Sequence, residues 1–241
     1  MNKVEVVQFV LGKQSEAFQF FDSQNARGQE LYPHDLLKAF HLREFPADEE
    51  EQKVDAVEVW EDMESEELAN LFEHYLYRIR AWSKGQRAWY FTKSDIGWFK
   101  GVNIERAESY PYINTHKLVH NRINQLSKDV PLFYGDREYI YPFQLDQLIL
   151  NGRRFFEMVS VYKSFVDELT DEEFAKTELD DTARNILTTI YNYDKHNRTG
   201  DVYVRKLFQA ALIYYVDRFG AHDLSTAIKK LFAWSYRLRL K

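Results

Sequence analysis

The chain contains no cysteine among its 241 residues. This absence excludes disulfide bonds, a thiolate nucleophile, and zinc or iron–sulfur sites built from cysteine. A chain without cysteine fits a reducing compartment. Residues 1–14 also lack the long apolar core and small-residue cleavage site of a secretory signal. We therefore predict a cytoplasmic protein.

Long hydrophobic runs are missing as well. The most apolar stretch, residues 207–216, is interrupted by Gln209 and is much shorter than the roughly 20 residues that a membrane span needs. We predict that this stretch lies in a core helix and that the protein has no membrane partner.

Self-contained catalytic motifs are not found either. The sequence has no glycine-rich phosphate loop followed by Lys and Ser or Thr, and no Gly-x-Ser-x-Gly element. His116 and His120 are four residues apart, which is the spacing of a zinc pair on one helix face. However, Lys117 stands where a zinc metalloprotease carries its glutamate, and no third ligand is evident. We favour a surface or core histidine pair, and we predict no catalytic residue, metal site or cofactor for this chain alone.

Positive charge is scarce in one segment. The net charge is −6, and residues 48–67 hold 11 acidic residues against one basic residue, Lys53. The remainder has 31 basic and 27 acidic residues, so it is mildly basic. The acidic run is typical of the solvated face of helices.

The residues that are present indicate a mainly α fold. Residues 4–11 are β-branched and aromatic and predict one N-terminal strand, whereas most later segments show helical spacing. Residues 101–152 form the most irregular stretch. We expect a multi-helix bundle with the apolar helix of residues 202–219 at its centre. A first helix is predicted from residue 14 to a stop at Gly28, and further helices span residues 33–45, 48–63, 65–84, 115–126, 153–169, 180–193, 201–219 and 222–240.

Arginine residues near predicted helix ends are candidate contacts for phosphate or DNA. They lie at one helix start, around the next helix and near the C-terminus. Exposed basic side chains on a helical protein are also common without any ligand, and that alternative stays open. The candidates are Arg153, Arg154, Arg198, Arg205, Arg237 and Arg239, and Lys195 and Lys206 add positive charge beside Arg198 and Arg205.

One motif near the N-terminus carries a family resemblance. Phe21, Asn25, Gly28, Leu31 and residues 35–38 follow the pattern Phe-x-x-x-Asn-x-x-Gly-x-x-Leu-x-x-x-Asp-Leu-Leu-Lys. This pattern resembles the GmrSD-type restriction family, also known as domain of unknown function 262. The stretches FTKSDIGWFKG, FQLDQLILNGRRFFEMV and NRTGDVYVRKLFQAALIYYVDRFG are similar to the helical region of such proteins.

The resemblance implies a ParB-like or sulfiredoxin-like nucleotide domain coupled to DNA restriction. Phe21, Asn25, Arg27 and Gly28 would be the remnant of its nucleotide site, although Asn25 and Gly28 also suit an ordinary helix stop and turn. The upstream motifs Ile-Pro-x-x-x-Arg and Asp-Gly-Gln-Gln-Arg, and a following HNH-type nuclease, have no counterpart in this sequence. A nucleotide and Mg²⁺ are therefore expected only together with the missing domain.

This comparison gives a predicted division of the chain. Residues 1–45 would be the truncated end of a ParB-like domain, and residues 46–241 a helical domain. Because a lone strand leaves its backbone hydrogen-bonding groups unpaired, residues 4–11 are expected to pair with a sheet elsewhere, including that of a second copy in a homo-oligomer.

Three functions fit these observations. The leading hypothesis is a non-catalytic helical module of a restriction or phage-defence protein, a fragment of a longer nucleotide-dependent protein, which docks DNA or a nuclease domain or subunit. The alternative is a nucleotide hydrolase or nuclease subunit completed by another chain or a dimer mate. The third is a helical interaction protein outside defence.

Overall fold

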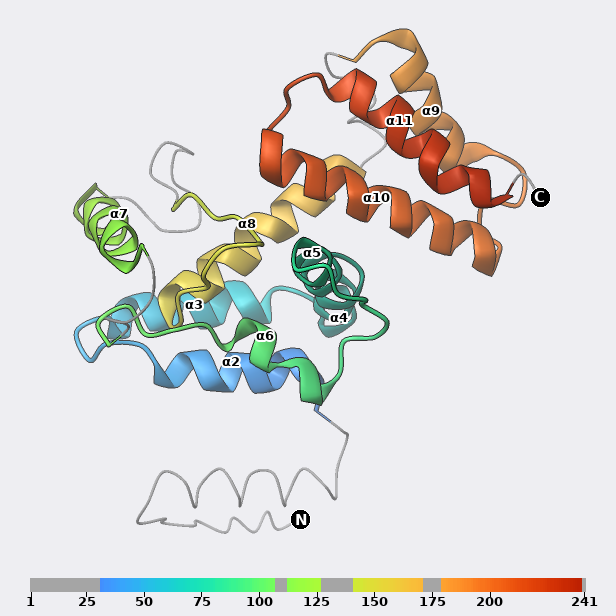
Figure 1. Cartoon of the computed structure of the whole chain (residues 1–241). Helices are drawn as coiled ribbons and strands as arrows, with labels where there is room; N and C mark the ends of the chain where they lie inside the picture. Colours follow the sequence, from blue (N-terminus) through green and yellow to red (C-terminus); the bar gives the residue numbers. More distant parts are fainter. Residues whose placement is uncertain (1–30, 107–111, 127–140, 171–178, 240–241) are drawn as a thin grey trace, which may run out of the picture.

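The computed structural model describes residues 31–106, 112–126, 141–170 and 179–239 (Figure 1). Helices dominate these ranges, so the prediction of a mainly α protein is confirmed. The β pairing found there is one isolated parallel bridge between Val102 and Leu150. The predicted strand of residues 4–11, the predicted helix from residue 14 to Gly28, and the residues Phe21, Asn25, Arg27 and Gly28 lie outside the described residues.

Helix α2 (Pro33–Arg43) begins where the sequence places a proline at the first helical position. The Asp35 carboxylate accepts a hydrogen bond from the backbone N–H of Tyr32 at 2.9 Å, which closes the first turn. Helix α2 packs against α4 (Ser65–Leu71), α6 (Gly97–Lys100) and α8 (Arg153–Thr170). The helix assigned from sequence to the N-terminal remnant thus contributes to the helical core.

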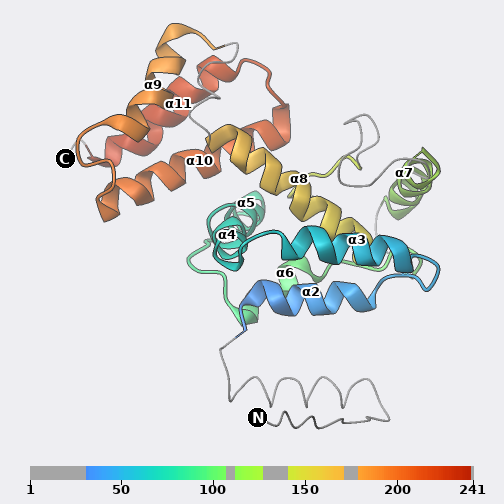
Figure 2. The same cartoon turned by 180° about the vertical axis from the view of Figure 1, so that it is seen from behind.

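Helix α3 (Glu50–Glu61) carries much of the acidic run and packs along α8 (Figure 2). Ala56 and Trp60 are buried on its inner face. The acidic residues Glu50, Asp55 and Glu58 are exposed. This arrangement agrees with the interpretation of the run as a solvated helix face.

The predicted helix of residues 65–84 is present with an irregularity. It consists of α4, a π-helical turn (Phe72–Leu76) and α5 (Tyr77–Ser83) in direct succession. Gly85 ends it with a positive φ of 69°. The N–H of Gly85 donates to the Trp82 carbonyl and the N–H of Gln86 to the Ala81 carbonyl, both at 2.9 Å, as in a Schellman motif.

The irregular stretch is held to the core by backbone contacts. The N–H of Val102 donates to the Ile149 carbonyl at 2.9 Å, and the N–H of Asn151 donates to the Val102 carbonyl at 3.0 Å. Buried Arg80 on α5 donates to the carbonyls of Trp98, Leu145 and Gln147. Three carbonyls that no helix satisfies therefore share one guanidinium group. Helix α7 (Ile113–Leu126) lies within this part of the chain.

The C-terminal part contains α9 (Asp181–Asn192), α10 (Thr199–Phe219) and α11 (Leu224–Tyr236), followed by a 3₁₀ turn (Arg237–Arg239). Helix α11 runs antiparallel to α10 (Figure 1) and also packs on α9. Helix α10 contacts α8, the π-helical turn and α5 as well. Helix α10 thus joins the C-terminal helices to α8 and α5, although Tyr203 and Phe219 on it are exposed.

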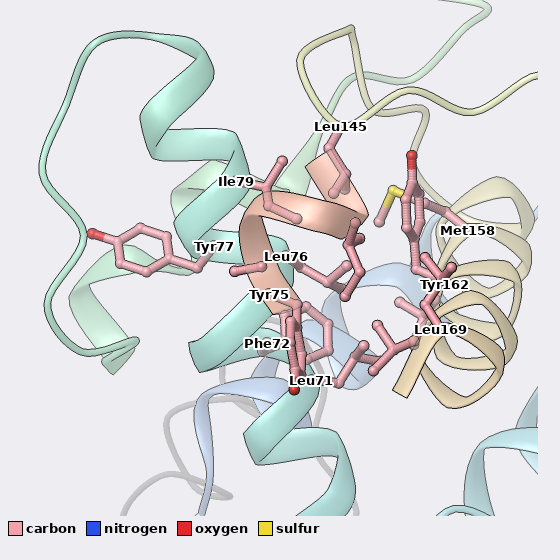
Figure 3. Packing of buried hydrophobic residues seen from close by; sticks show 14 of the residues in the cluster. Leu71, Phe72, Tyr75, Leu76, Tyr77, Ile79, Leu145, Met158, Tyr162 and Leu169 are labelled. Atoms are coloured by element: carbon pink, nitrogen blue, oxygen red, sulfur yellow. The ribbon is translucent and has the colours of Figure 1, made fainter. Parts of the chain in front are cut away.

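The core is rich in aromatic side chains. Phe72, Phe99 and Phe155 are fully buried and belong to one cluster that extends through the described helices. Figure 3 shows Leu71, Phe72 and Tyr75 meeting side chains of α8, among them Tyr162 and Leu169. Burial of each large apolar side chain contributes about 2 kcal/mol. This cluster fixes α8 against the continuous helical segment of α4, the π-helical turn and α5, which we call the α4–α5 rod. Both α8 and the rod pack against α10 and so position it.

No helix within the described ranges has the length and apolar character needed to cross a membrane.

Candidate nucleic-acid interface

Three basic side chains meet where α5 lies beside α10. Arg78 comes from α5, and Arg205 and Lys206 come from α10. We call these three residues the cationic seam. Lys206 Nζ donates to Asn70 Oδ1 on α4 at 3.1 Å, so its side chain reaches across from α10 to the α4–α5 rod.

The charges of Arg78 and Arg205 act on Lys206. Burial lowers the pKa of Lys206, Glu73 raises it, and the charges of Arg78 and Arg205 lower it again. Burial also lowers the pKa of Arg78, an effect that Glu73 opposes. Among the described residues, Glu73 is the carboxylate that acts on both Arg78 and Lys206. Glu73 thus offsets part of the positive charge of the seam.

His74 lies in the π-helical turn, where the charges of Lys206 and Arg78 act on it. Burial, followed by the charges of Lys206 and Arg78, lowers its pKa to about 4, so the imidazole is neutral at pH 7. Its buried Nδ1 has no hydrogen-bond partner among the described residues. Single π-helical turns occur frequently at functional sites because they place side chains out of the regular helical register.

Arg205 and Tyr203 complete the surface of the seam. Arg205 Nη1 donates to the His196 carbonyl at 3.1 Å, and its guanidinium lies 5.6 Å from the centre of the Tyr191 ring. The Tyr203 side chain is 56% exposed and interacts electrostatically with Arg78. An exposed aromatic ring beside basic residues is a combination that suits nucleic acid.

The other basic candidates near α10 gather at its N-terminus. Arg239 forms a two-pronged ion pair with buried Asp201, with Nε–Oδ1 at 3.0 Å and Nη2–Oδ2 at 2.7 Å. This pair closes the 3₁₀ turn onto α10. Arg198 at the N-cap and Arg237 are exposed. Arg198 and Arg237 add positive charge near the helix N-terminus, where an anion is favoured, whereas Asp201 balances the charge of Arg239.

A family model matches residues 52–241 with the description "Family of unknown function (DUF7834)". The chain belongs to this family. The match includes every residue of the cationic seam and of the arginine group at the start of α10. No curated protein and no solved structure matched the chain.

Within this family member, Arg153 and Arg154 are placed differently from the other candidates. Their exposed fractions are 8% and 2%, and both form ion pairs with buried Glu157, with Arg153 Nε at 2.9 Å from Oε1. Arg154 Nε also donates to His120 Nδ1 at 3.2 Å, and its guanidinium lies over the Tyr141 ring. The geometry gives these arginines a structural role, and they do not join the seam.

The histidine pair of α7 contributes to the same packing. His116 Nδ1 lies 2.6 Å from the Tyr141 hydroxyl, while His120 contacts Arg154. Burial, and then the charges of Arg154 and Arg153, lower the pKa of His120 to about 4. The described residues contain no group of three or more potential metal ligands. In this structure His120 connects α7 to α8, and His116 connects α7 to Tyr141 in the segment before α8.

Arg78 is the member of the seam that sequence reasoning missed. It lies more than a hundred residues from Lys206 in the chain. The available signal was local, because His74 and Arg78 share one helix face at a spacing of four. That pattern is common on solvated helices and does not identify the neighbouring helix.

Proposed function

We propose that this chain is a non-catalytic helical module of a GmrSD-like restriction or phage-defence protein, and that it contacts DNA phosphates through the cationic seam. The observation that carries this proposal is the convergence of Arg78, Arg205 and Lys206, among which Glu73 is the carboxylate that raises the pKa of both Arg78 and Lys206. The protein class rests on the resemblance of the sequence motifs. The DNA contact rests on the charges.

Phosphate oxygens would supply negative charge and hydrogen-bond acceptors to the cations of the seam. An arginine offers several N–H donors, and a lysine offers a mobile point charge. A phosphate placed between them would offset the repulsion that disfavours the charged form of Lys206. Such contact is independent of base sequence and weakens steeply with salt. The nearby Arg198 and Arg237 would extend the basic surface along the same DNA.

The non-catalytic part of the proposal is supported by the way in which two buried arginines are used in the core. Arg80 binds three backbone carbonyls and Arg154 binds Glu157 and His120. These groups hold helices together. Nucleotide and Mg²⁺ chemistry would belong to the domain that the resemblance implies, in which Phe21, Asn25, Arg27 and Gly28 would take part. A nuclease domain or subunit is the expected protein partner.

The DNA contact is tested by fluorescence anisotropy with a labelled duplex at low salt. Lys206→Ala and Arg78→Ala should each weaken binding several-fold, and the double variant by at least about tenfold, through lost phosphate contacts. Lys230→Ala on α11 is the matched control, because Lys230 is exposed and outside the seam. Equal affinities for the double variant and the control would overturn the proposed interface.

The non-catalytic assignment has a separate test. The purified chain with Mg²⁺ is expected to release no phosphate from GTP or ATP. Phosphate release that disappears in Asn25→Ala would contradict it and favour a nucleotide hydrolase.

A further inference from the structure

Two aromatic side chains project from the loop that follows α5. Trp89 and Tyr90 are adjacent in the chain, and their side chains are 73% and 66% exposed. Their neighbours on either side behave in the opposite way, since Ala88 packs against the core and Phe91 is buried in it. The loop therefore arches outward between two internal anchors and presents both rings to solvent.

The loop that carries Trp89 and Tyr90 is anchored to the core on both sides of the two rings. The Phe91 ring stacks on Phe72 with centroids 5.4 Å apart and meets the edge of Phe99 at 5.5 Å. On the following side, the Asp95 carboxylate accepts hydrogen bonds from the Thr92 N–H at 3.0 Å and the Tyr77 hydroxyl at 3.1 Å. The Schellman motif at Gly85 fixes the other end. Exposed rings on a fixed frame lose little conformational entropy when a ligand stacks on them.

The charges around the rings favour an anionic partner. Arg87 is exposed, and Lys84 lies at the start of the loop with its Nζ 5.2 Å from the centre of the Trp98 ring. The one carboxylate among residues 84–95, that of Asp95, already accepts hydrogen bonds from the Thr92 N–H and the Tyr77 hydroxyl. An acidic protein surface would satisfy the cations. A polyanion that also carries flat rings satisfies both the cations and the aromatic pair.

We propose that Trp89 and Tyr90 form a stacking platform for unpaired bases of single-stranded nucleic acid, with Arg87 and Lys84 directed to its phosphates. Every base has an aromatic face, so stacking of this kind tolerates any sequence, and an aromatic pair accommodates successive bases. In duplex DNA the bases are already stacked on one another. The platform is therefore distinct in ligand and position from the cationic seam, and it does not depend on the function proposed for the seam.

The test uses a fluorescein-labelled oligothymidine and the full chain. Trp89→Ala and Tyr90→Ala should each weaken binding by roughly tenfold, as expected for the loss of one base stack, while Trp89→Phe retains most of the affinity. Trp234→Ala is the matched control, because Trp234 is also exposed but lies on α11. Duplex binding should be unchanged in the platform variants.

Two results would overturn the platform. One is oligothymidine binding by Trp89→Ala that equals that of Trp234→Ala. The other is a dimer of the unmodified chain that becomes a monomer in Trp89→Ala without a change in oligothymidine affinity, which would make the loop a protein interface. Seam variants that keep duplex binding alongside a functioning platform would contradict the function proposed for the seam and leave the platform intact.

Discussion

His41 on α2 and Gly152 before α8 are joined by a hydrogen bond in which the Gly152 N–H donates to His41 Nδ1 at 3.2 Å. His41 Nε2 donates to the Phe99 carbonyl at 3.1 Å, and the ring stacks on Phe155 with centroids 3.6 Å apart. One neutral imidazole thus connects three segments that are far apart in the sequence. Both nitrogens are engaged, so protonation would remove the acceptor that Gly152 needs.

This bond predicts acid sensitivity. Burial lowers the pKa of His41 to about 3, whereas an unfolded histidine titrates near 6.5. Because the folded value lies below the unfolded one, the stabilisation is fully present above pH 6.5 and is lost as the pH falls toward 3. His41→Ala should lower the free energy of unfolding at pH 7.5 by about 2–4 kcal/mol. It should also reduce the further loss between pH 7.5 and pH 5.

Urea unfolding at the two pH values measures both effects. His222→Ala is the control, because His222 is exposed and its removal should leave the pH dependence intact. A His41→Ala variant with the same pH dependence as the unmodified chain would contradict the assignment.

The buried pairs of Glu157 predict a large cost for removing one charge. Arg153 and Arg154 both rely on this carboxylate, and all three residues are buried. Glu157→Gln would leave two guanidinium groups without their main counter-charge, which costs about 3–5 kcal/mol for a buried pair. Glu58→Gln on the exposed face of α3 should change stability by less than about 0.5 kcal/mol. Similar denaturation midpoints for the two variants would refute the structural role of the network.

Two glycines with positive φ differ in their surroundings, and Gly101, with ψ of −157°, also lies in a backbone region that is essentially restricted to glycine. Gly101 and Gly85 have φ of 63° and 69°. A Cβ at Gly101 would lie 2.4 Å from the Ile149 carbonyl oxygen, whereas a Cβ at Gly85 meets nothing within 4 Å. Gly85→Ala should cost about 1 kcal/mol from backbone strain alone. Gly101→Ala should cost at least about 2 kcal/mol more, and equal thermal stabilities would rule out the close contact.

Much of the fold could be predicted from local sequence signals. Pro33 begins α2, and the Asp180 carboxylate accepts from the Ala183 N–H at 2.9 Å at the start of α9. Gly85 and Gly220 end helices with positive φ. Such signals act within one turn of the chain and therefore appear directly in the sequence. The π-helical turn in residues 65–84 was missed because the apolar spacing of a helix does not reveal one inserted residue.

The candidate interface was predicted only in part. Arg205 and Lys206 appeared as adjacent basic residues, and their partner Arg78 comes from another helix whose position is set by core packing. The burial of Arg153 and Arg154 likewise depends on α7 and on the Glu157 carboxylate. Basic residues look alike in a sequence, and tertiary packing decides which of them support the core and which meet at a surface.

The most direct measurement of the central claim is the salt dependence of duplex DNA binding. Each phosphate neutralised on duplex DNA contributes about −0.9 to the slope of log affinity against log salt concentration. The double variant Arg78→Gln and Lys206→Gln should make the slope shallower by about 1–2, whereas Lys230→Gln should leave it unchanged. A double variant with the slope and affinity of the unmodified chain would show that the cationic seam does not bind DNA.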